Sequence, residues 1–177
     1  MKKVIENAGF TKIELLVAML ILTVSTSLAL PGFSNWLPGY RLKGAVRDLY
    51  SNLQLAKSWA IRARGECAVK FNASGNSYQV VSGGPDRVYS TADDNVVLKT
   101  VILPDYGSGL SFGPGSATRK VGQNEPVADS VSFPGDRVVF NSIGMTTGTL
   151  GGYAYVTNNR NACYVCRRDM VFRNRGA

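Results

Sequence analysis

The feature that most constrains the fold is a long apolar run close to the start of the chain. Leu15 to Leu30 contains 16 residues, interrupted only by the hydroxyl side chains at positions 23 and 25–27. Counted from Phe10 the segment has 21 residues. As an α-helix it would be ~31 Å long, which matches the hydrocarbon core of a bilayer. Lys2 and Lys3 precede it, so the positive-inside rule predicts a single membrane pass with a cytoplasmic N-terminus and an exported remainder.

Two other interpretations of this segment stay open. A secretory signal would be cut at the small-x-small sequence Ser27-Leu28-Ala29, and a plain signal anchor would not be cut. A secretory signal is disfavoured because its apolar region would begin with a glutamate, Glu14. Inserting a charge at the bilayer centre costs roughly 3 kcal/mol on insertion scales, so such a carboxylate is expected to have a charged partner or a function. Within one chain, Thr11-x-x-Glu14 fits a capping box, and a carboxylate is favourable at the positive end of a helix.

The residues around Glu14 also resemble a known export signal. The chain is similar to type IV prepilins and pseudopilins in its class III signal, Gly9-Phe10-Thr11-Lys12-Ile13-Glu14-Leu15-Leu16-Val17. The resemblance implies that a prepilin peptidase cuts between Gly9 and Phe10, and that Phe10 is then N-methylated. It also implies that Glu14 pairs with the free amino terminus of a neighbouring subunit, which sets the register as subunits enter a filament. Lys12 departs from the pattern, because the family usually has an apolar residue there.

Beyond the apolar run, the sequence predicts an amphipathic continuation of the same helix. Pro31 and Pro38 are expected to kink it. Apolar residues then recur at steps of four and three along one helical face. These residues are Leu42, Val46, Leu49, Leu53, Ala56, Ala60 and Ala63. The stripe is expected to pack on a sheet, and Gly65 is expected to end the helix as its C-cap residue.

The remainder is predicted to form strands and turns, without an internal repeat or a second domain. The expected strands cover 67–71, 77–81, 96–103, 130–133, 137–141, 152–157 and 163–172. Ala73-Ser74-Gly75-Asn76 and Pro134-Gly135-Asp136 are each expected to join a hairpin. The predicted fold class is α+β and pilin-like, with a long N-terminal helix, transmembrane in its first half, packed against an antiparallel β-sheet head. The expected parts are a removed leader (1–9), a transmembrane and assembly helix (10–31), its amphipathic continuation (32–65) and a periplasmic head (66–177).

Two stretches of the head extend the resemblance. "LYSNLQLAKSWAIRARG" and the later "FNSIGMTTGTLGGYAYVTN" are similar to the GspH/FimT family. That family comprises the H-type pseudopilins of type II secretion and the FimT/FimU minor pilins of type IV pili. It implies a structural protein and not an enzyme: a minor pilin that primes assembly of a type IV pilus or sits near its tip. The alternatives are an H-type pseudopilin of a type II secretion system and a DNA-binding minor pilin that serves DNA uptake.

The same resemblance implies a location and a set of partners. The subunit is expected in the bacterial inner membrane, with its head in the periplasm, and in a pilus or pseudopilus after assembly. Its partners are expected to be the prepilin peptidase and other pilins or pseudopilins.

The C-terminal stretch is strongly basic, in a chain with 20 basic and 12 acidic residues and a net charge of +8. Arg167, Arg168, Arg173 and Arg175 are candidates for binding DNA phosphates. Some FimT-like minor pilins resemble this stretch in using a Gly-Arg-x-Arg end to hold DNA, but Phe172 stands where that glycine would be. The alternative is a solvated or subunit-contacting basic edge.

The three cysteines, Cys67, Cys163 and Cys166, are candidates for a disulfide in an oxidising periplasm. The sequence does not select the pair. A zinc site needs four ligands, and the chain has no histidine. A redox Cys-x-x-Cys normally lies at a helix N-terminus, whereas these surroundings predict strands.

An acidic loop offers a candidate calcium site. Asp86, Asp93, Asp94 and Asn95 lie close together in the stretch from Gly83 to Val97. Hard oxygen ligands grouped in a turn suit Ca²⁺, and the loop also resembles the calcium loop of the major pseudopilins. Asx-rich turns without a metal are the alternative.

Overall fold

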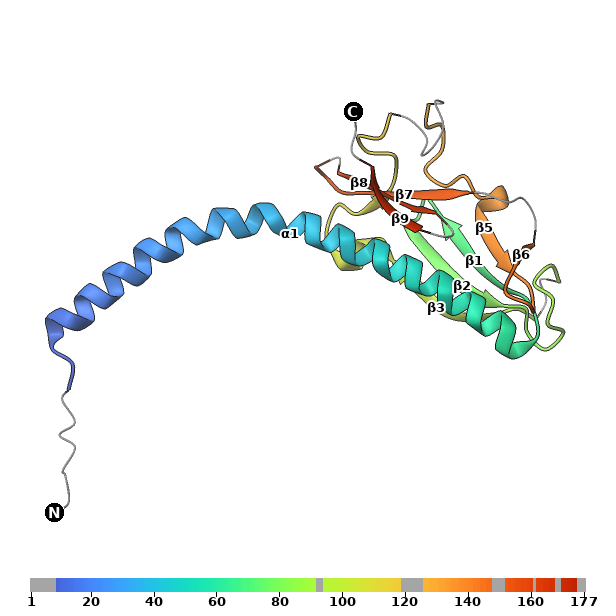
Figure 1. Ribbon diagram of the computed structural model, residues 1–177, viewed down its shortest axis with the longest axis horizontal. Helices are drawn as coiled ribbons and strands as arrows, with labels where there is room; N and C mark the ends of the chain where they lie inside the picture. The colour runs from blue at the N-terminus through green and yellow to red at the C-terminus, as the bar shows by residue number, and fades with distance from the viewer. Residues whose placement is uncertain are drawn as a thin grey trace, which may run out of the picture. The chain divides into compact units, whose positions relative to one another are not determined.

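The longest element of the structure is helix α1, Lys12–Ala63 (Figure 1). The computed structural model describes residues 9–91, 94–118, 126–147, 152–160, 162–167 and 170–174. By its internal contacts the chain divides into two compact units, Met1–Leu37 and Pro38–Ala177, and α1 contributes to both. The helix continues through Pro31 and Pro38, although neither proline has the N–H that would bond the carbonyl four residues earlier.

Helix α1 ends in a Schellman motif. The Arg64 N–H donates to the Ile61 carbonyl (3.3 Å), and the Gly65 N–H donates to the Ala60 carbonyl (3.1 Å). Arg64 is the residue with left-handed geometry, with φ of 50°. Gly65 was predicted to have that role, and this prediction is wrong. Gly65 instead permits a close approach, because a Cβ there would lie 2.7 Å from the Cβ of Arg87.

The second unit contains a five-stranded antiparallel sheet with the order β3-β2-β1-β5-β6. Its strands are β1 (Cys67–Asn72), β2 (Ser77–Ser82), β3 (Val96–Ile102), β5 (Arg137–Phe140) and β6 (Thr146–Thr147). The β1–β2 hairpin confirms the predicted turn at residues 73–76, with Cys67 opposite Ser82. The Asn72 side chain accepts from the Gly75 N–H (2.9 Å), and Asn76 has φ of 47°. Asparagine tolerates that geometry, which is why this sequence turns here.

A four-stranded antiparallel sheet has the order β4-β7-β8-β9. Its strands are β4 (Ser111–Phe112), β7 (Tyr153–Thr157), β8 (Cys163–Arg167) and β9 (Met170–Asn174). Two 3₁₀ turns, η1 (Leu103–Tyr106) and η2 (Pro134–Asp136), complete the head. The expected combination of a long N-terminal helix with antiparallel β-structure is confirmed. The described strands form two sheets, whereas the sequence predicted one.

Two predicted strand arrangements are wrong. Residues 130–133 do not pair with 137–141; β5 pairs with β1, and Val131 makes an isolated bridge to Ala154 in β7. The turn η2 redirects the chain between them, with positive φ at Gly135 and Asp136. The predicted strand 163–172 is divided into the hairpin of β8 and β9.

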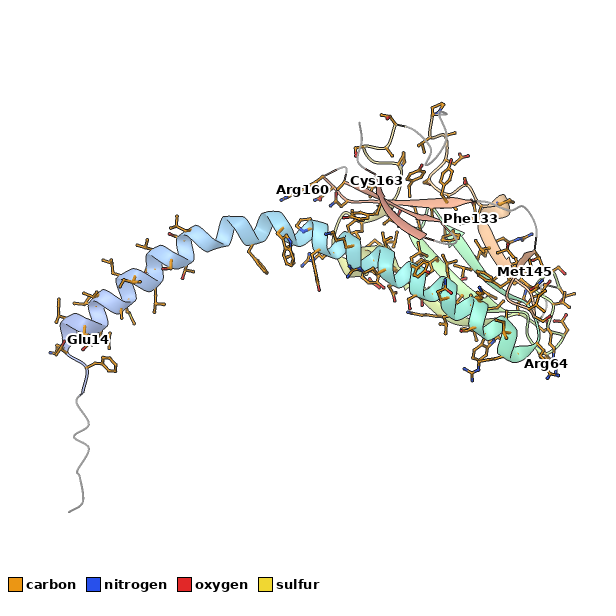
Figure 2. All side chains as sticks on the ribbon, viewed as in Figure 1. Glu14, Arg64, Phe133, Met145, Arg160 and Cys163 are labelled. Atoms are coloured by element: carbon orange, nitrogen blue, oxygen red, sulfur yellow. The ribbon has the colours of Figure 1, made fainter. Side chains whose placement is uncertain are left out.

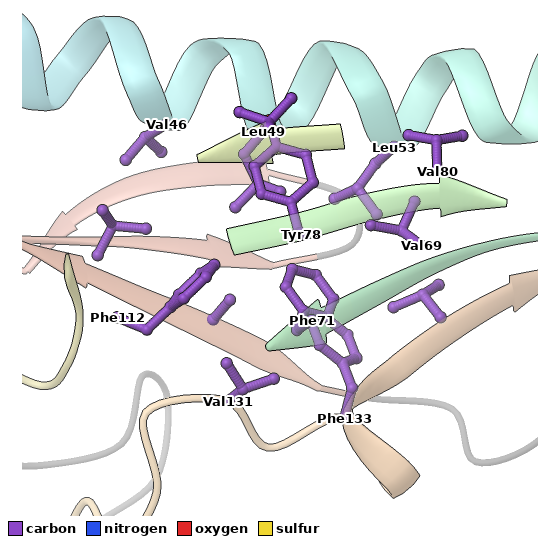
Figure 3. Close-up of a cluster of buried hydrophobic side chains, with 14 of the residues drawn as sticks. Val46, Leu49, Leu53, Val69, Phe71, Tyr78, Val80, Phe112, Val131 and Phe133 are labelled. Atoms are coloured by element: carbon purple, nitrogen blue, oxygen red, sulfur yellow. The ribbon is translucent and has the colours of Figure 1, made fainter. Parts of the chain in front are cut away.

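The apolar stripe of α1 packs onto the sheet, as predicted. Its members are at most 1 % exposed: Leu42, Val46, Leu49, Leu53, Ala56 and Ala60. Ala63 was also expected there but is exposed, because the helix ends at that residue. Figure 3 shows Val46, Leu49 and Leu53 directed from the helix toward the strands. Every buried apolar residue of the described chain lies between Leu42 and Tyr164, so the second unit holds a core of its own.

Candidate functional site

The first turn of α1 contains one of the two hydrogen bonds of the predicted capping box. The Thr11 hydroxyl accepts from the Glu14 N–H (3.2 Å), which satisfies one of the free donors at the helix start. Glu14 lies in the first turn, where the helix dipole favours a carboxylate. Its side chain is exposed and makes no hydrogen bond or ion pair with any residue that the structure describes. The carboxylate is therefore available to a partner.

The apolar side chains that follow Glu14 are also exposed. Ile13 is 67 % exposed, Leu20 65 % and Leu28 74 %. The intervening hydroxyls bond back into the helix: Thr23 donates to the Met19 carbonyl (2.6 Å) and Thr26 to the Leu22 carbonyl (2.7 Å). This segment thus presents an apolar surface on which the hydroxyls of Thr23 and Thr26 are satisfied.

In the part of the chain that the structure describes, no helix is both long enough and apolar enough to cross a membrane. The inner-membrane span inferred from the sequence stays a prediction.

A group of polar residues joins α1 to the head, and we call it the Asp48 cluster: Asp48, Asn52, Tyr78, Lys99 and Tyr106. The Asp48 carboxylate accepts from Asn52 (3.0 Å), Tyr78 (3.5 Å) and Tyr106, and pairs with Lys99 at 3.5 Å. Asn52 also donates to the Tyr78 hydroxyl (2.8 Å) and accepts from Lys99 (3.0 Å). Burial raises the pKa of both tyrosines, so their hydroxyls stay protonated and serve as donors. The cluster fixes the register of the helix on β2, β3 and η1.

Replacing Asp48 with alanine is expected to destabilise the head by roughly 1–3 kcal/mol, because Tyr78 and Asn52 lose an acceptor that water does not replace. The measurement is urea unfolding of residues 38–177, the unit with its own core. Asp105→Ala is the control, since Asp105 is exposed, and should change stability by less than about 0.5 kcal/mol. Equal effects of both variants would show that the cluster does not hold the helix.

The acidic loop is folded by its own side chains. Asp86 accepts from the Val88 N–H (2.8 Å) and the Thr91 hydroxyl, and the hydroxyl bond is the main reason why its pKa lies below the ordinary value. Asp94 accepts from the Asp86 N–H (3.2 Å), and Asn95 donates to the Tyr89 carbonyl (3.0 Å). These hydrogen bonds are the ones expected of an Asx-rich turn that holds no metal. Asp93, the remaining candidate, lies outside the described residues.

Two oxygen atoms of this loop favour a cation. Asp94 Oδ1 and Asn95 Oδ1 are buried and accept no hydrogen bond from the residues that the structure describes. Within the described ranges, however, no group of three or more His, Cys, Asp or Glu residues is placed to hold a metal ion. The loop therefore fits Ca²⁺ only in part, with Asp94 and Asn95 as the residues that would hold it, and the calcium site stays a prediction.

If calcium binds this loop, Ca²⁺ at ten times its dissociation constant should raise the melting temperature of the head by about 5 °C. A chelator should reverse the shift, and Asp94→Ala should abolish it. The measurement is a thermal melt with and without millimolar Ca²⁺, with Mg²⁺ as the control ion. An unchanged melting temperature would leave the Asx turn as the whole explanation of these residues.

The structure does not contain the expected disulfide, because Cys67 and Cys163 are both free and buried. Each possible pair among the three cysteines contains at least one of them. Cys67 lies in β1 and Cys163 in β8, which belong to different sheets. Cys163 and Cys166 share strand β8, where three residues span roughly 10 Å. A disulfide needs Cα atoms about 4.4–6.8 Å apart.

These buried thiols predict a loss of stability at high pH. Burial raises the pKa of Cys67 and of Cys163 from 9.0 to about 12. The folded state therefore binds the proton more tightly than the unfolded state, and this contribution is present below pH 9 and is lost as pH rises toward 12. Between pH 9.5 and 11 the unfolding free energy should fall by about 1 kcal/mol per pH unit for each thiol. Urea unfolding of a Cys67→Ala, Cys163→Ala variant should show a shallower decline, and an equal decline would contradict this origin.

The basic C-terminal candidates are only partly described. Arg167 belongs to β8 and Arg173 to β9, whereas Arg168 and Arg175 lie outside the described residues. In the hairpin, Arg167 is opposite Met170, and Arg173 is opposite Tyr164. The two described arginines thus lie on different strands of the hairpin. DNA binding stays a prediction.

The sequence did not reveal the Asp48 cluster. Asp48 lies within the predicted helix and Tyr78 within a predicted strand, but their side chains meet only after the sheet has formed. Asn52 was the available signal, because it is a polar residue three positions after Leu49 and four before Ala56, at the spacing of the apolar face. In the structure it is only 3 % exposed.

Comparison with known proteins gives a family. A family model described as type II transport protein GspH matches residues 45–169, more than two thirds of the 177 residues. Among solved structures, the minor pseudopilin EpsH from the type 2 secretion system of Vibrio cholerae is similar. The TM-score is 0.47 at 12 % identity, and the match covers 72 % of this chain and 88 % of that chain. No curated protein matches the chain. On the strength of the family model, the chain belongs to the GspH family of type II transport proteins.

Proposed function

We propose that this protein is a minor pseudopilin of a type II secretion system, packed through its N-terminal helix among other pseudopilins in a filament. Membership of the GspH family supports this function over the type IV pilus subunit that the sequence first suggested. The structural observation that carries the proposal is an apolar helix whose side chains are exposed from Phe10 to Leu28 while Glu14 is unpartnered within the described chain.

The helices of neighbouring subunits would supply the apolar surrounding and the cation that this segment lacks. Large apolar side chains gain roughly 1.5–3 kcal/mol each when they leave water, so the segment needs an apolar surrounding. The helices of other subunits offer one, and the hydroxyls of Thr23 and Thr26 enter it already bonded. In that surrounding the Glu14 carboxylate requires a cation.

The cation we propose is the amino terminus of an adjacent subunit. A cut between Gly9 and Phe10 creates this amine four residues before Glu14 in sequence. Charge pairing between chains then sets how far one subunit is displaced from the next, because only one offset brings carboxylate and amine together. Cleavage by a prepilin peptidase, methylation of Phe10 and storage in the inner membrane before assembly are parts of this proposal.

The head would be carried rigidly on the second half of the helix. The buried stripe from Leu42 to Ala60 and the Asp48 cluster both attach α1 to the strands. A displacement of the helix would therefore move the head with it. This property suits a structural subunit in a filament.

A secretion assay tests the proposal. Cells that lack the gene should fail to release type II substrates, and the intact gene supplied in trans should restore release. Pilus-dependent motility and DNA uptake should be unaffected. Normal secretion together with lost motility or DNA uptake would reverse the assignment in favour of a type IV pilus.

A further inference from the structure

The turn that joins β5 to β6 is unusually well fixed for a loop that carries large apolar side chains. The Asn141 side chain accepts from the N–H groups of Ile143 (3.2 Å) and Met145 (2.9 Å). The Asn141 N–H donates to the Met145 carbonyl (2.8 Å), and the Gly144 N–H donates to the Asn141 carbonyl (2.8 Å). Four hydrogen bonds thus hold a turn of five residues in one conformation.

The turn also rests on the end of helix α1. Gly144 is buried with φ of 76°, and a Cβ there would lie 2.7 Å from Ile61 Cδ1 and 3.2 Å from Lys57 Cε. Ile143 is 70 % exposed, Met145 62 % and Ile61 46 %. Figure 2 labels Met145 and Arg64 at this end of the head.

Positive charge borders these apolar side chains. Lys57 lies four residues before Ile61 and shares its face of the helix, and Arg64 directly follows the last helical residue, Ala63. Both side chains are exposed, and neither forms an ion pair with a residue in the described ranges. We call Lys57, Ile61, Arg64, Ile143 and Met145 the Ile143 surface.

We propose that the Ile143 surface is an interface with the head of a neighbouring filament subunit, and that the contacting patch of that subunit is apolar and bordered by carboxylates. The inference rests on the proposed function, since it requires a filament. Three exposed apolar side chains favour a protein partner, and the two cations require acidic groups at its border. The fixed turn means that little conformational freedom is lost when the interface forms.

Site-specific photo-crosslinking of the full chain in secreting cells tests the inference. A benzophenone amino acid replaces Met145 in one variant, Val97 in a second and Leu20 in a third. Val97 is a matched control on β3 with 51 % exposure, and Leu20 reports on entry of the N-terminal helix into the filament. Crosslinked peptides are identified by mass spectrometry.

The probe at 145 should attach to an apolar residue beside Asp or Glu in another filament subunit, at a higher yield than the probe at 97. Adding Lys57→Glu and Arg64→Glu should lower that yield about fivefold and leave the Leu20 crosslinks unchanged. One contrary result is that the probe at 145 gives no crosslink, and another is that it attaches only to lipid, DNA or a protein outside the filament. If Leu20 still crosslinks, either result overturns this inference and leaves the proposed function standing. Loss of the Leu20 crosslinks overturns the proposed function and this inference with it.

Discussion

Subunits carrying Glu14→Ala are expected to enter filaments roughly 100-fold less often than the original, because removing one partner of a buried ion pair leaves the other charge uncompensated. In the free chain this carboxylate bonds to no residue that the structure describes, so the fold itself should lose little. The measurement is the share of subunit in sheared filaments against the share in cells, after equal expression.

Glu6→Ala is the matched control for that experiment. It removes the same charge within the leader, which processing is expected to remove, so assembly should remain within about twofold of the original. Equal entry of the Glu14→Ala and original subunits would contradict the pairing with a neighbouring amine. In that case Glu14 would act through the helix dipole alone, a contribution of only about 0.3–1 kcal/mol.

Phe71→Ala is expected to lower the unfolding free energy of the head by about 3–5 kcal/mol, the largest single effect on its stability. The Phe71 ring stacks on Phe133 with centroids 5.5 Å apart and meets Phe112 edge-on at 5.8 Å. It also lies 6.3 Å from Tyr78, the phenol of the Asp48 cluster. Figure 3 shows these rings in the centre of the core. Alanine would leave a cavity that several strands border and none can fill alone.

Urea unfolding of residues 38–177 measures this loss, with Val97→Ala as the control. Val97 is half exposed on β3, so its truncation should change stability by no more than about 0.5 kcal/mol. The midpoint for Phe71→Ala should fall while the slope stays constant. A small effect would mean that Phe112 and Phe133 close over the space and that the core is more adaptable than its packing indicates.

The sequence predicted those parts of the fold that depend on neighbours along the chain. The stripe from Leu42 to Ala60 follows from helical periodicity, and the β1–β2 hairpin follows from the turn at residues 73–76. The Thr11 cap is similarly local. In each of these, the contacts lie within one helix or one hairpin.

Pairings between distant segments were not predicted. Strand β5 joins β1 across more than 60 residues, with Cys67 opposite Phe140, although Pro134-Gly135-Asp136 resembles an ordinary hairpin turn. The Asp48 cluster joins one helix with two strands and a 3₁₀ turn. No periodicity marks such contacts, because they arise only when the layers pack. For the cysteines, an oxidising compartment favoured a disulfide, whereas Cys67 and Cys163 are free in the structure.

The most direct test of assembly through the N-terminal helix is the mass of the mature protein purified from its own cells. Loss of residues 1–9 together with one added methyl group is expected, because both follow from processing between Gly9 and Phe10. An intact leader, or a new terminus after Ala29, would contradict prepilin processing. It would also remove the amine that the Glu14 carboxylate is proposed to meet.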